Sequence, residues 1–143
     1  MGVVPLVEVW GFSPNIKKLS DAVFVALESG HPAAAVLPDV YHLHRGGSAM
    51  SGLDRLAGSA IGIFHVNDYP KIDRDKIVDA DRVYPGDGIA PLKGLLRDLH
   101  AIGFRGMLSL ELFNPDYYKL DAADVVKTGL ARMKAVVAGA FAS

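Results

Sequence analysis

The sequence contains no cysteine among its 143 residues. A disulfide framework and a thiolate metal site are therefore excluded, and the composition is compatible with a reducing compartment. The sequence also has no excess of positive charge, because 15 Lys and Arg residues stand against 16 Asp and Glu residues. Proteins that bind nucleic acid through counterion release need such an excess, so we expect no nucleic-acid partner.

An apolar run long enough to span a bilayer is also missing. The opening residues, MGVVPLVEVW, lack the basic segment and the long apolar core of a signal peptide. Leu6 stands where an N-myristoylation motif has Ser or Thr. We therefore expect a soluble cytoplasmic protein without a membrane partner. Half of the residues are hydrophobic, which is enough for one core, so residues 1–143 are treated as a single domain.

Short apolar segments alternate with segments of helical periodicity along the chain. The predicted strands cover 3–9, 32–37, 60–66 and 106–113, and the predicted helices cover 16–29, 51–58, 91–103 and 121–140. A glycine-rich loop is expected between the second strand and the second helix, and a long charged loop at 67–88. Continuous apolar strands that alternate with helices are typical of parallel β/α units. The predicted fold class is therefore α/β, with four parallel β/α units.

Each predicted strand ends in, or is followed by, a residue that can bind a metal. These residues are Glu8, Asp39, His65 and Glu111. In parallel β/α folds the carboxyl ends of the strands form the ligand-binding face, so we expect the four side chains to converge there. The oxygen-rich set favours Mn²⁺, Mg²⁺ or Co²⁺ over a structural Zn²⁺ cage, and Zn²⁺ stays open as an alternative. A cation would also offset the cost of burying three carboxylates together.

Taken singly, each of these residues also has an ordinary structural interpretation. An acidic residue at a strand end is most often a helix cap, a turn residue or a surface charge, and a histidine there is more often a hydrogen-bonded core residue than a ligand. The occurrence of such residues at four successive strand ends is what favours a metal site.

The order of several motifs resembles the C-terminal half of the sugar phosphate isomerase/epimerase family, the xylose isomerase-like TIM barrels. The motifs are LVEVWGFS, DVYHLHRGG, FHVNDYP, VYPGDG and LSLELFN, and together they extend over nearly the whole chain. The resemblance implies that this chain is the C-terminal half of a (β/α)₈ barrel. It also implies that Glu8, Asp39, His65 and Glu111 bind one divalent metal ion, with Mn²⁺ favoured.

The resemblance further implies roles in catalysis. Glu8 and Glu111 would form the acid/base pair that exchanges a carbon-bound proton, and His42 would contact a substrate oxygen. This chemistry is sound in physical terms, because a metal that chelates a carbonyl and its neighbouring hydroxyl acidifies the carbon and stabilises an enediolate. The implied function is a metal-dependent sugar or sugar-phosphate isomerase or epimerase of carbohydrate metabolism, acting on a small keto sugar or polyol.

Two further substrate contacts are predicted. Lys71 lies where several epimerases have an arginine that reaches the site, although lysine lacks the bidentate fork of arginine. Trp10 follows Glu8 and is predicted to form an apolar wall for the sugar, with core packing or a lid contact as the alternative.

Four nearby residues receive other predictions. His44 is interpreted as a solvated loop residue, with a contact to one of the metal ligands as the alternative. Asp68 is a candidate that resembles either an extra metal ligand or a hydrogen-bonding partner. Arg82 and Asp87 are expected to shape the long loop, in which PGDG is a turn signal.

The length of the chain raises the question of its other half, because a (β/α)₈ barrel typically has about 250 residues. Four units alone would leave two exposed strand edges and an uncovered apolar face. We therefore expect a homo-oligomer of half-barrels or a missing N-terminal half. The alternatives to an isomerase are a dehydratase that acts on a cyclic polyol ketone and a non-catalytic half-barrel.

Overall fold

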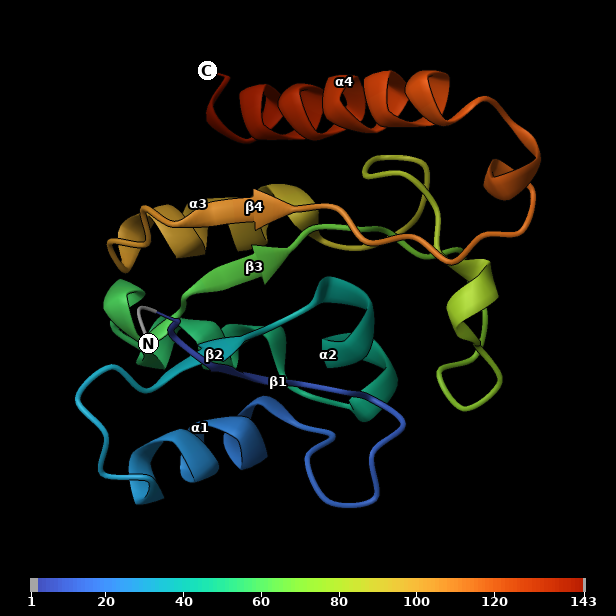
Figure 1. Cartoon of the computed structure of the whole chain (residues 1–143). Coiled ribbons are helices and arrows are strands. Elements are labelled where there is room, and N and C mark those ends of the chain that lie inside the picture. The colour runs from blue at the N-terminus through green and yellow to red at the C-terminus, as the bar shows by residue number, and fades with distance from the viewer. Residues whose placement is uncertain (1–2, 143) are drawn as a thin grey trace.

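The computed structural model describes residues 3–142 and alternates strands with helices in the predicted order (Figure 1). The strands are β1 (Leu6–Glu8), β2 (Ala35–Leu37), β3 (Ile63–His65) and β4 (Met107–Ser109). The α-helices are α1 (Leu19–Glu28), α2 (Val40–Gly46), α3 (Leu92–Ala101) and α4 (Ala122–Phe141). Short 3₁₀ helices cover Met50–Arg55, Gly58–Ala60, Asp79–Asp81 and Tyr117–Lys119. No helix among the described residues is long and apolar enough to cross a membrane.

The four strands run parallel in the order β1, β2, β3, β4. β1 pairs with β2 and β3 pairs with β4, in both cases with parallel register. Isolated parallel bridges, Val36 to Ile61 and Asp39 to His65, join the two pairs. The carboxyl ends of all four strands therefore lie on one side, as the arrows in Figure 1 show. This arrangement is half of the strand set of an α/β barrel.

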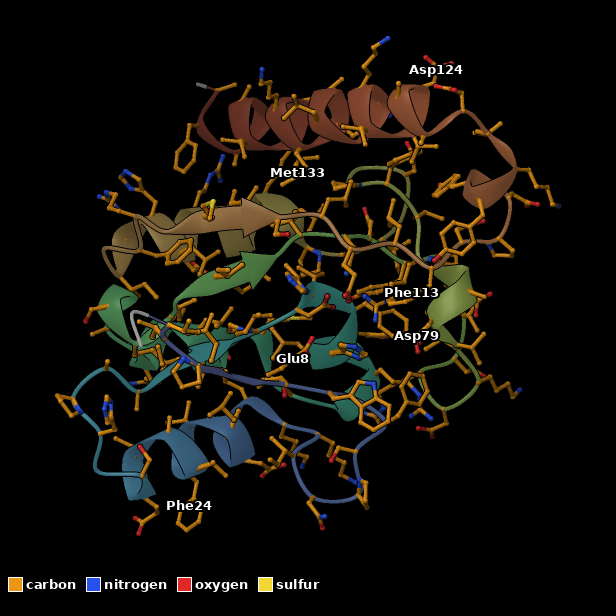
Figure 2. All side chains as sticks on the ribbon, in the orientation of Figure 1. Glu8, Phe24, Asp79, Phe113, Asp124 and Met133 are labelled. Atoms are coloured by element: carbon orange, nitrogen blue, oxygen red, sulfur yellow. The ribbon has the colours of Figure 1, made fainter. Side chains whose placement is uncertain are left out.

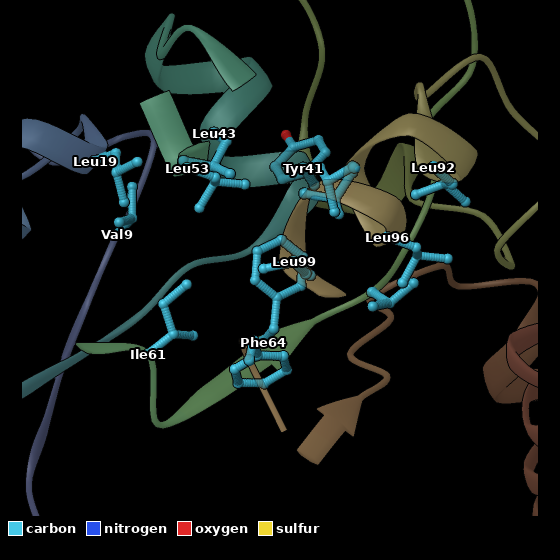
Figure 3. Packing of buried hydrophobic residues seen from close by; sticks show 14 of the residues in the cluster. Val9, Leu19, Tyr41, Leu43, Leu53, Ile61, Phe64, Leu92, Leu96 and Leu99 are labelled. Atoms are coloured by element: carbon cyan, nitrogen blue, oxygen red, sulfur yellow. The ribbon is translucent and has the colours of Figure 1, made fainter. Parts of the chain in front are cut away.

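The hydrophobic core lies between the strands and the helices behind them. Phe64 of β3 is fully buried and belongs to the same cluster as the apolar face of α3 (Figure 3). That face consists of Leu92, Leu95, Leu96 and Leu99, all of them buried. Leu19 and Ala22 anchor α1 to the same cluster. Each helix thus buries one apolar face against the strands, and the strands direct apolar side chains toward the helices. This packing explains why apolar strand segments alternate with amphipathic helical segments in the sequence.

The opposite face of the sheet is not covered by a helix among the described residues. Side chains alternate along a strand, so Ile63 and His65 lie on the face away from Phe64. Met107 of β4 is 70% exposed, and Val3, just before β1, is 76% exposed. The uncovered face and the free edges at β1 and β4 are those expected of half a barrel.

Residues 40–46 form a helix where the sequence predicted a glycine-rich loop. Asp39 caps α2, because its carboxylate accepts a hydrogen bond of 2.9 Å from the backbone N–H of His42. Gly47 adopts a left-handed conformation, with φ of 75°, and ends the helix. Gly46 and Gly47 therefore terminate α2, and the glycine-rich loop expected directly after the second strand is replaced by this helix. The helix predicted at 51–58 is the 3₁₀ helix Met50–Arg55.

The long loop that follows β3 is organised by the buried carboxylate of Asp68. Its oxygens accept hydrogen bonds of 2.8–3.1 Å from four backbone N–H groups. The donors are Tyr69, Gly86, Gly88 and Ala90. Both ends of the loop are therefore held by one side chain.

We predict that Phe64→Ala lowers the free energy of unfolding by about 3–5 kcal/mol, because it leaves a cavity in the core. Chemical denaturation measures the change. Phe24→Ala is a matched control, because Phe24 is 63% exposed and projects away from the strands (Figure 2). Its effect should stay within about 0.5 kcal/mol. Equal losses in the two variants would contradict this description of the core.

We predict that Asp68→Ala destabilises the loop by about 3 kcal/mol or more, because buried N–H groups lose a charged acceptor. Hydrogen exchange should accelerate at the amides of Gly86, Gly88 and Ala90. Asp73→Ala is the control, since the Asp73 side chain is 76% exposed and pairs only with Lys76. Unchanged exchange at the three amides would show that Asp68 does not hold the loop.

Candidate metal and active site

Four residues with ligand-type side chains occupy the carboxyl ends of the four strands, as the sequence predicted. Glu8 ends β1 and His65 ends β3, while Asp39 and Glu111 lie two residues beyond β2 and β4. Because the strands are parallel neighbours, these positions share one rim.

Three of the four side chains come close enough to share an ion. His65 Nδ1 lies 3.4 Å from Asp39 Oδ2 and 3.8 Å from Glu111 Oε2. One ligand atom from each of the three lies within 4.8 Å of the others. A second set with the same spacing contains Glu8, His42 and Glu111. Glu111 belongs to both sets, so the fourth predicted residue, Glu8, joins the cluster through Glu111.

The two oxygens of Asp39 have different partners. Oδ1 accepts the N–H of His42 and thereby caps α2. Oδ2 faces the cluster, where it accepts a 2.8 Å hydrogen bond from the side-chain amide of Asn67. Asn67 is fully buried, and its amide oxygen accepts the N–H of Tyr41. Asn67 fixes the orientation of the Asp39 carboxylate, a role that the sequence analysis did not identify.

Arg82 is the main feature of the site that the sequence analysis missed. Its guanidinium is fully buried, and Nη1 donates to Glu111 Oε2 at 3.0 Å and to Asp39 Oδ2 at 3.3 Å. Nε and Nη2 also bond to Asp79, which lies near Phe113 on the side where the strand arrows end (Figure 2). The expectation that Arg82 only shapes the loop was therefore incomplete, because its charged group enters the cluster.

The tautomer of His42 follows from its contact with Arg82. His42 Nε2 lies 2.8 Å from Nη2 of Arg82, and a guanidinium can only donate hydrogen bonds. Nε2 is therefore the acceptor, and the proton of the neutral ring resides on Nδ1. Burial lowers the pKa of His42, with the Arg82 charge acting in the same direction and Asp39 opposing both. Nδ1 is buried and has no hydrogen-bond partner among the described residues, so a donor is free at the site.

The negative charge of the cluster shifts the pKa of His65. Burial alone would lower it, but Asp39, Glu111 and Glu8 together raise the pKa of His65 above its ordinary value. Nδ1 of His65 is also buried, and its approach to Asp39 does not have hydrogen-bond geometry. This unpartnered nitrogen between carboxylates is the arrangement that a cation would complete.

The carboxylates respond to the cluster in opposite directions. Burial and then the Glu111 charge raise the pKa of Glu8, which makes Glu8 the more basic carboxylate. Burial would also raise the pKa of Asp39, but His65, Arg82 and the cap bond from His42 hold it below its usual value. Glu8 is thus suited to proton transfer, and Asp39 to staying ionised.

The remaining predicted residues lie at or beyond the margin of the cluster. Trp10 is 50% exposed and its ring packs against Phe12 at 6.2 Å between centroids. Lys71 is exposed, and its side chain has no hydrogen bond or ion pair within residues 3–142, so no contact in this structure ties it to the cluster. His44 is half-buried in α2, and its ring stacks on that of Tyr69 with 4.1 Å between the ring centroids. This contact corrects the interpretation of His44 as a solvated loop residue.

Asp68 was considered in the sequence analysis as an extra metal ligand or a hydrogen-bonding partner. Both of its carboxylate oxygens accept hydrogen bonds from backbone N–H groups. Of the two predicted roles, the structure therefore supports that of a hydrogen-bonding partner. Asp87 is partly exposed and pairs with Arg132 of α4 at 3.2 Å, so it does tie the loop to the body of the domain.

Comparison with known proteins identifies relatives that are described as sugar-type isomerases and dehydratases. An inosose isomerase from Bacillus velezensis is 37% identical over 112 residues, which are 78% of this chain and 40% of the relative. A 3-dehydroshikimate dehydratase from Pseudomonas putida is 30% identical over 92 residues, 63% of this chain and 14% of that protein. The chain thus spans less than half of the length of these relatives.

Among solved structures, the IOLI protein with a bound zinc atom is similar over 96% of this chain and 49% of that chain, with 28% identity and a TM-score of 0.83. The family model described as xylose isomerase-like TIM barrel matches residues 1–136. This chain belongs to the xylose isomerase-like TIM barrel family.

Proposed function

We propose that this chain carries the metal-binding half of an isomerase or epimerase that acts on a keto sugar or a cyclic polyol ketone. The observation that carries the proposal is the convergence of Asp39 Oδ2, His65 Nδ1 and the Glu111 carboxylate at three neighbouring strand ends. The inosose isomerase relative supports a polyol ketone as the substrate class.

The donor set fits a divalent cation. It combines one imidazole nitrogen with carboxylate oxygens, which are the ligands that Mn²⁺, Mg²⁺, Co²⁺ and Zn²⁺ accept. The unpartnered Nδ1 of His65 supports this fit, since a buried nitrogen among carboxylates has no other partner within residues 3–142. Asp39, His65 and Glu111 would hold the ion, with Glu8 as the fourth ligand. Mn²⁺ is our choice, and the zinc atom in the similar IOLI structure makes Zn²⁺ the first alternative.

The bound ion would polarise the substrate carbonyl and so acidify the neighbouring carbon. Glu8 takes the proton from that carbon, because its raised pKa makes it a better base than an ordinary glutamate. Glu111 enters the cycle protonated and donates its proton back to that carbon, so the step ends with Glu8 protonated and Glu111 ionised. The Arg82 guanidinium fixes the orientation of Glu111. The Nδ1–H of His42 donates to a substrate oxygen. Trp10 would cover the apolar side of the sugar ring.

Turnover requires that the uncovered face be closed. The substrate would otherwise stand between the ligand cluster and open solvent, where water weakens every electrostatic contact. We propose that a second half-barrel closes it, supplied either by a second copy of this chain or by an N-terminal half. The share of the relatives that this chain spans supports a missing half.

We predict that the affinity for Mn²⁺ rises with pH. The carboxylates raise the pKa of His65 above its ordinary value, and only the neutral ring binds a metal, so protons compete with the ion up to a higher pH than they would at an ordinary histidine. The dissociation constant should be about tenfold larger near pH 6 than near pH 8, as measured by calorimetric titration.

The matched variants for this titration are His65→Ala and His100→Ala. His100 is exposed on α3, and its ring contacts Phe141 of α4 rather than a residue of the metal cluster. His65→Ala should abolish tight binding, and His100→Ala should retain both the affinity and its pH dependence. Binding that is independent of pH, or that survives His65→Ala, would refute the assigned ligand set.

We predict that Glu8→Gln and Glu111→Gln each slow turnover of the assembled barrel by about 10²–10⁴-fold, because an amide can neither accept the proton, as Glu8 does, nor donate one, as Glu111 does. The measurement is the NMR exchange of the carbon-bound proton of an inosose for solvent deuterium. His100→Ala is again the control and should exchange at the parental rate. Parental exchange in both glutamate variants would exclude the acid/base pair.

Dehydration is the second candidate, because one relative is a 3-dehydroshikimate dehydratase. Both reactions begin with the same proton removal, so deuterium exchange alone does not separate them. Loss of a β-hydroxyl produces a conjugated ketone that absorbs in the ultraviolet, whereas isomerisation does not. Growth of that absorbance in step with exchange would assign the chain to the dehydratase class.

A further inference from the structure

A cavity lined by basic side chains lies near the candidate metal cluster, because Phe12 in its wall also lies beside His42. Its volume is about 380 Å³, and it lies between the segment that follows β1, the end of α2 and residues 74–75 of the long loop. Basic side chains dominate its lining, which includes Lys17, Lys18, Arg45 and Arg74, with Asp75 as its acidic member. The proposed isomerase chemistry makes no use of these residues.

The basic residues of this cavity are short of negative partners. Within residues 3–142, Lys17, Lys18 and Arg45 form no ion pair, and Arg74 pairs with Asp75 at 3.6 Å in an exposed contact. The chain as a whole has a net charge of −1, so the clustering is local and does not reflect a basic protein. Mutual repulsion among the cations makes an anion the natural complement.

Arg45 offers the strongest sign of a missing partner. Its Nε is buried and has no hydrogen-bond partner among the described residues, although a buried guanidinium nitrogen usually finds one. The guanidinium carbon lies 4.6 Å from the centroid of the Phe12 ring, which holds the group in place. The same ring lies 6.2 Å from the ring of His42. Phe12 therefore stands between the basic cavity and the metal cluster.

Close backbone packing fixes the walls of the cavity. A Cβ on Gly46 would lie 1.8 Å from the carbonyl oxygen of Lys17, and a Cβ on Gly11 would lie 2.8 Å from Cβ of Arg45. Only glycine permits these approaches, so the segment after β1 and the end of α2 are held at a set distance. The cations are thus brought together by the fold rather than by chance contacts of long side chains.

We propose that this cavity binds the phosphate group of a phosphorylated keto sugar or polyol whose carbonyl end reaches the metal cluster. A phosphate monoester carries a charge of about −1.5 to −2 near neutral pH and offers three oxygens, which suits two arginines and two lysines. A carboxylate carries half that charge and leaves most of the cations unpaired. The assignment of this phosphate to the substrate rests on the proposed function.

The first test is calorimetric titration of the metal-free 143-residue chain with inorganic phosphate. We expect saturable binding that weakens about tenfold or more in Lys17→Gln/Lys18→Gln and in Arg45→Gln, since each loses charge-assisted hydrogen bonds. Lys134→Gln, on the exposed side of α4, is the charge-matched control and should bind like the parent. No saturable binding by the parent, or equal binding by all variants, overturns the proposal.

Circular dichroism must accompany the Arg45→Gln titration, because Arg45 packs on Phe12. The double lysine variant keeps the test independent of that packing, since both lysines are exposed. Glu111→Gln separates the two proposals. Phosphate binding that persists in Glu111→Gln while turnover is lost supports both sites, whereas active protein without phosphate binding overturns the phosphate site alone.

A competition experiment identifies the source of the phosphate. In the Mn²⁺-loaded protein, fructose 6-phosphate should bind about tenfold or more tightly than fructose, and this advantage should vanish in Lys17→Gln/Lys18→Gln. Fructose 6-phosphate that binds no better than inorganic phosphate would overturn the substrate assignment and identify a site for free phosphate. Retention of the advantage in the lysine variant would place the phosphate elsewhere.

Discussion

The buried guanidinium of Arg82 is the interaction on which the arrangement of the rim depends. It pairs with Asp39 beyond β2, with Glu111 beyond β4 and with Asp79 in the long loop, while its face lies over Tyr41. Segments that are far apart in the sequence are thus joined by one charge. Burial makes each of these pairs costly to break, because removing one partner leaves an uncompensated charge in a medium that solvates it poorly.

One guanidinium does not neutralise the three carboxylates of the cluster. The pKa shifts of His65 and Glu8 both reflect the remaining negative charge. The pKa of His65 is raised by the carboxylates despite burial, and that of Glu8 is raised by burial and by Glu111. Both groups therefore tend to hold protons, although the Arg82 charge acts to lower the pKa of Glu8. A divalent cation would supply such compensation with two charges at once, and its binding would favour the ionised form of Glu8.

The position of the ligand residues could be predicted from the sequence because it follows from strand periodicity and parallel order alone. Arg82 could not be predicted in this way, since its partner Asp39 lies 43 residues away and a lone arginine in a charged loop carries no periodic signal. Helix α2 was missed for a related reason. Asp39 was assigned to the metal, but its second oxygen caps the helix, and one carboxylate that serves two purposes shows only one in a sequence pattern.

The positions of the proposed ligands indicate which part of a complete barrel would bind the metal and which part would enclose the substrate. All four lie at or just beyond the strand ends of this chain, so the proposed metal cluster would be built by neighbouring β/α units without a ligand from across the barrel axis. Enclosure of the substrate is different, because the face that carries His65 is open among the described residues, and Met107 on the last strand is 70% exposed. On the proposed function, binding of the ion and turnover would therefore be separable properties, because the half-barrel would hold the ion and the element that covers it would enclose the substrate.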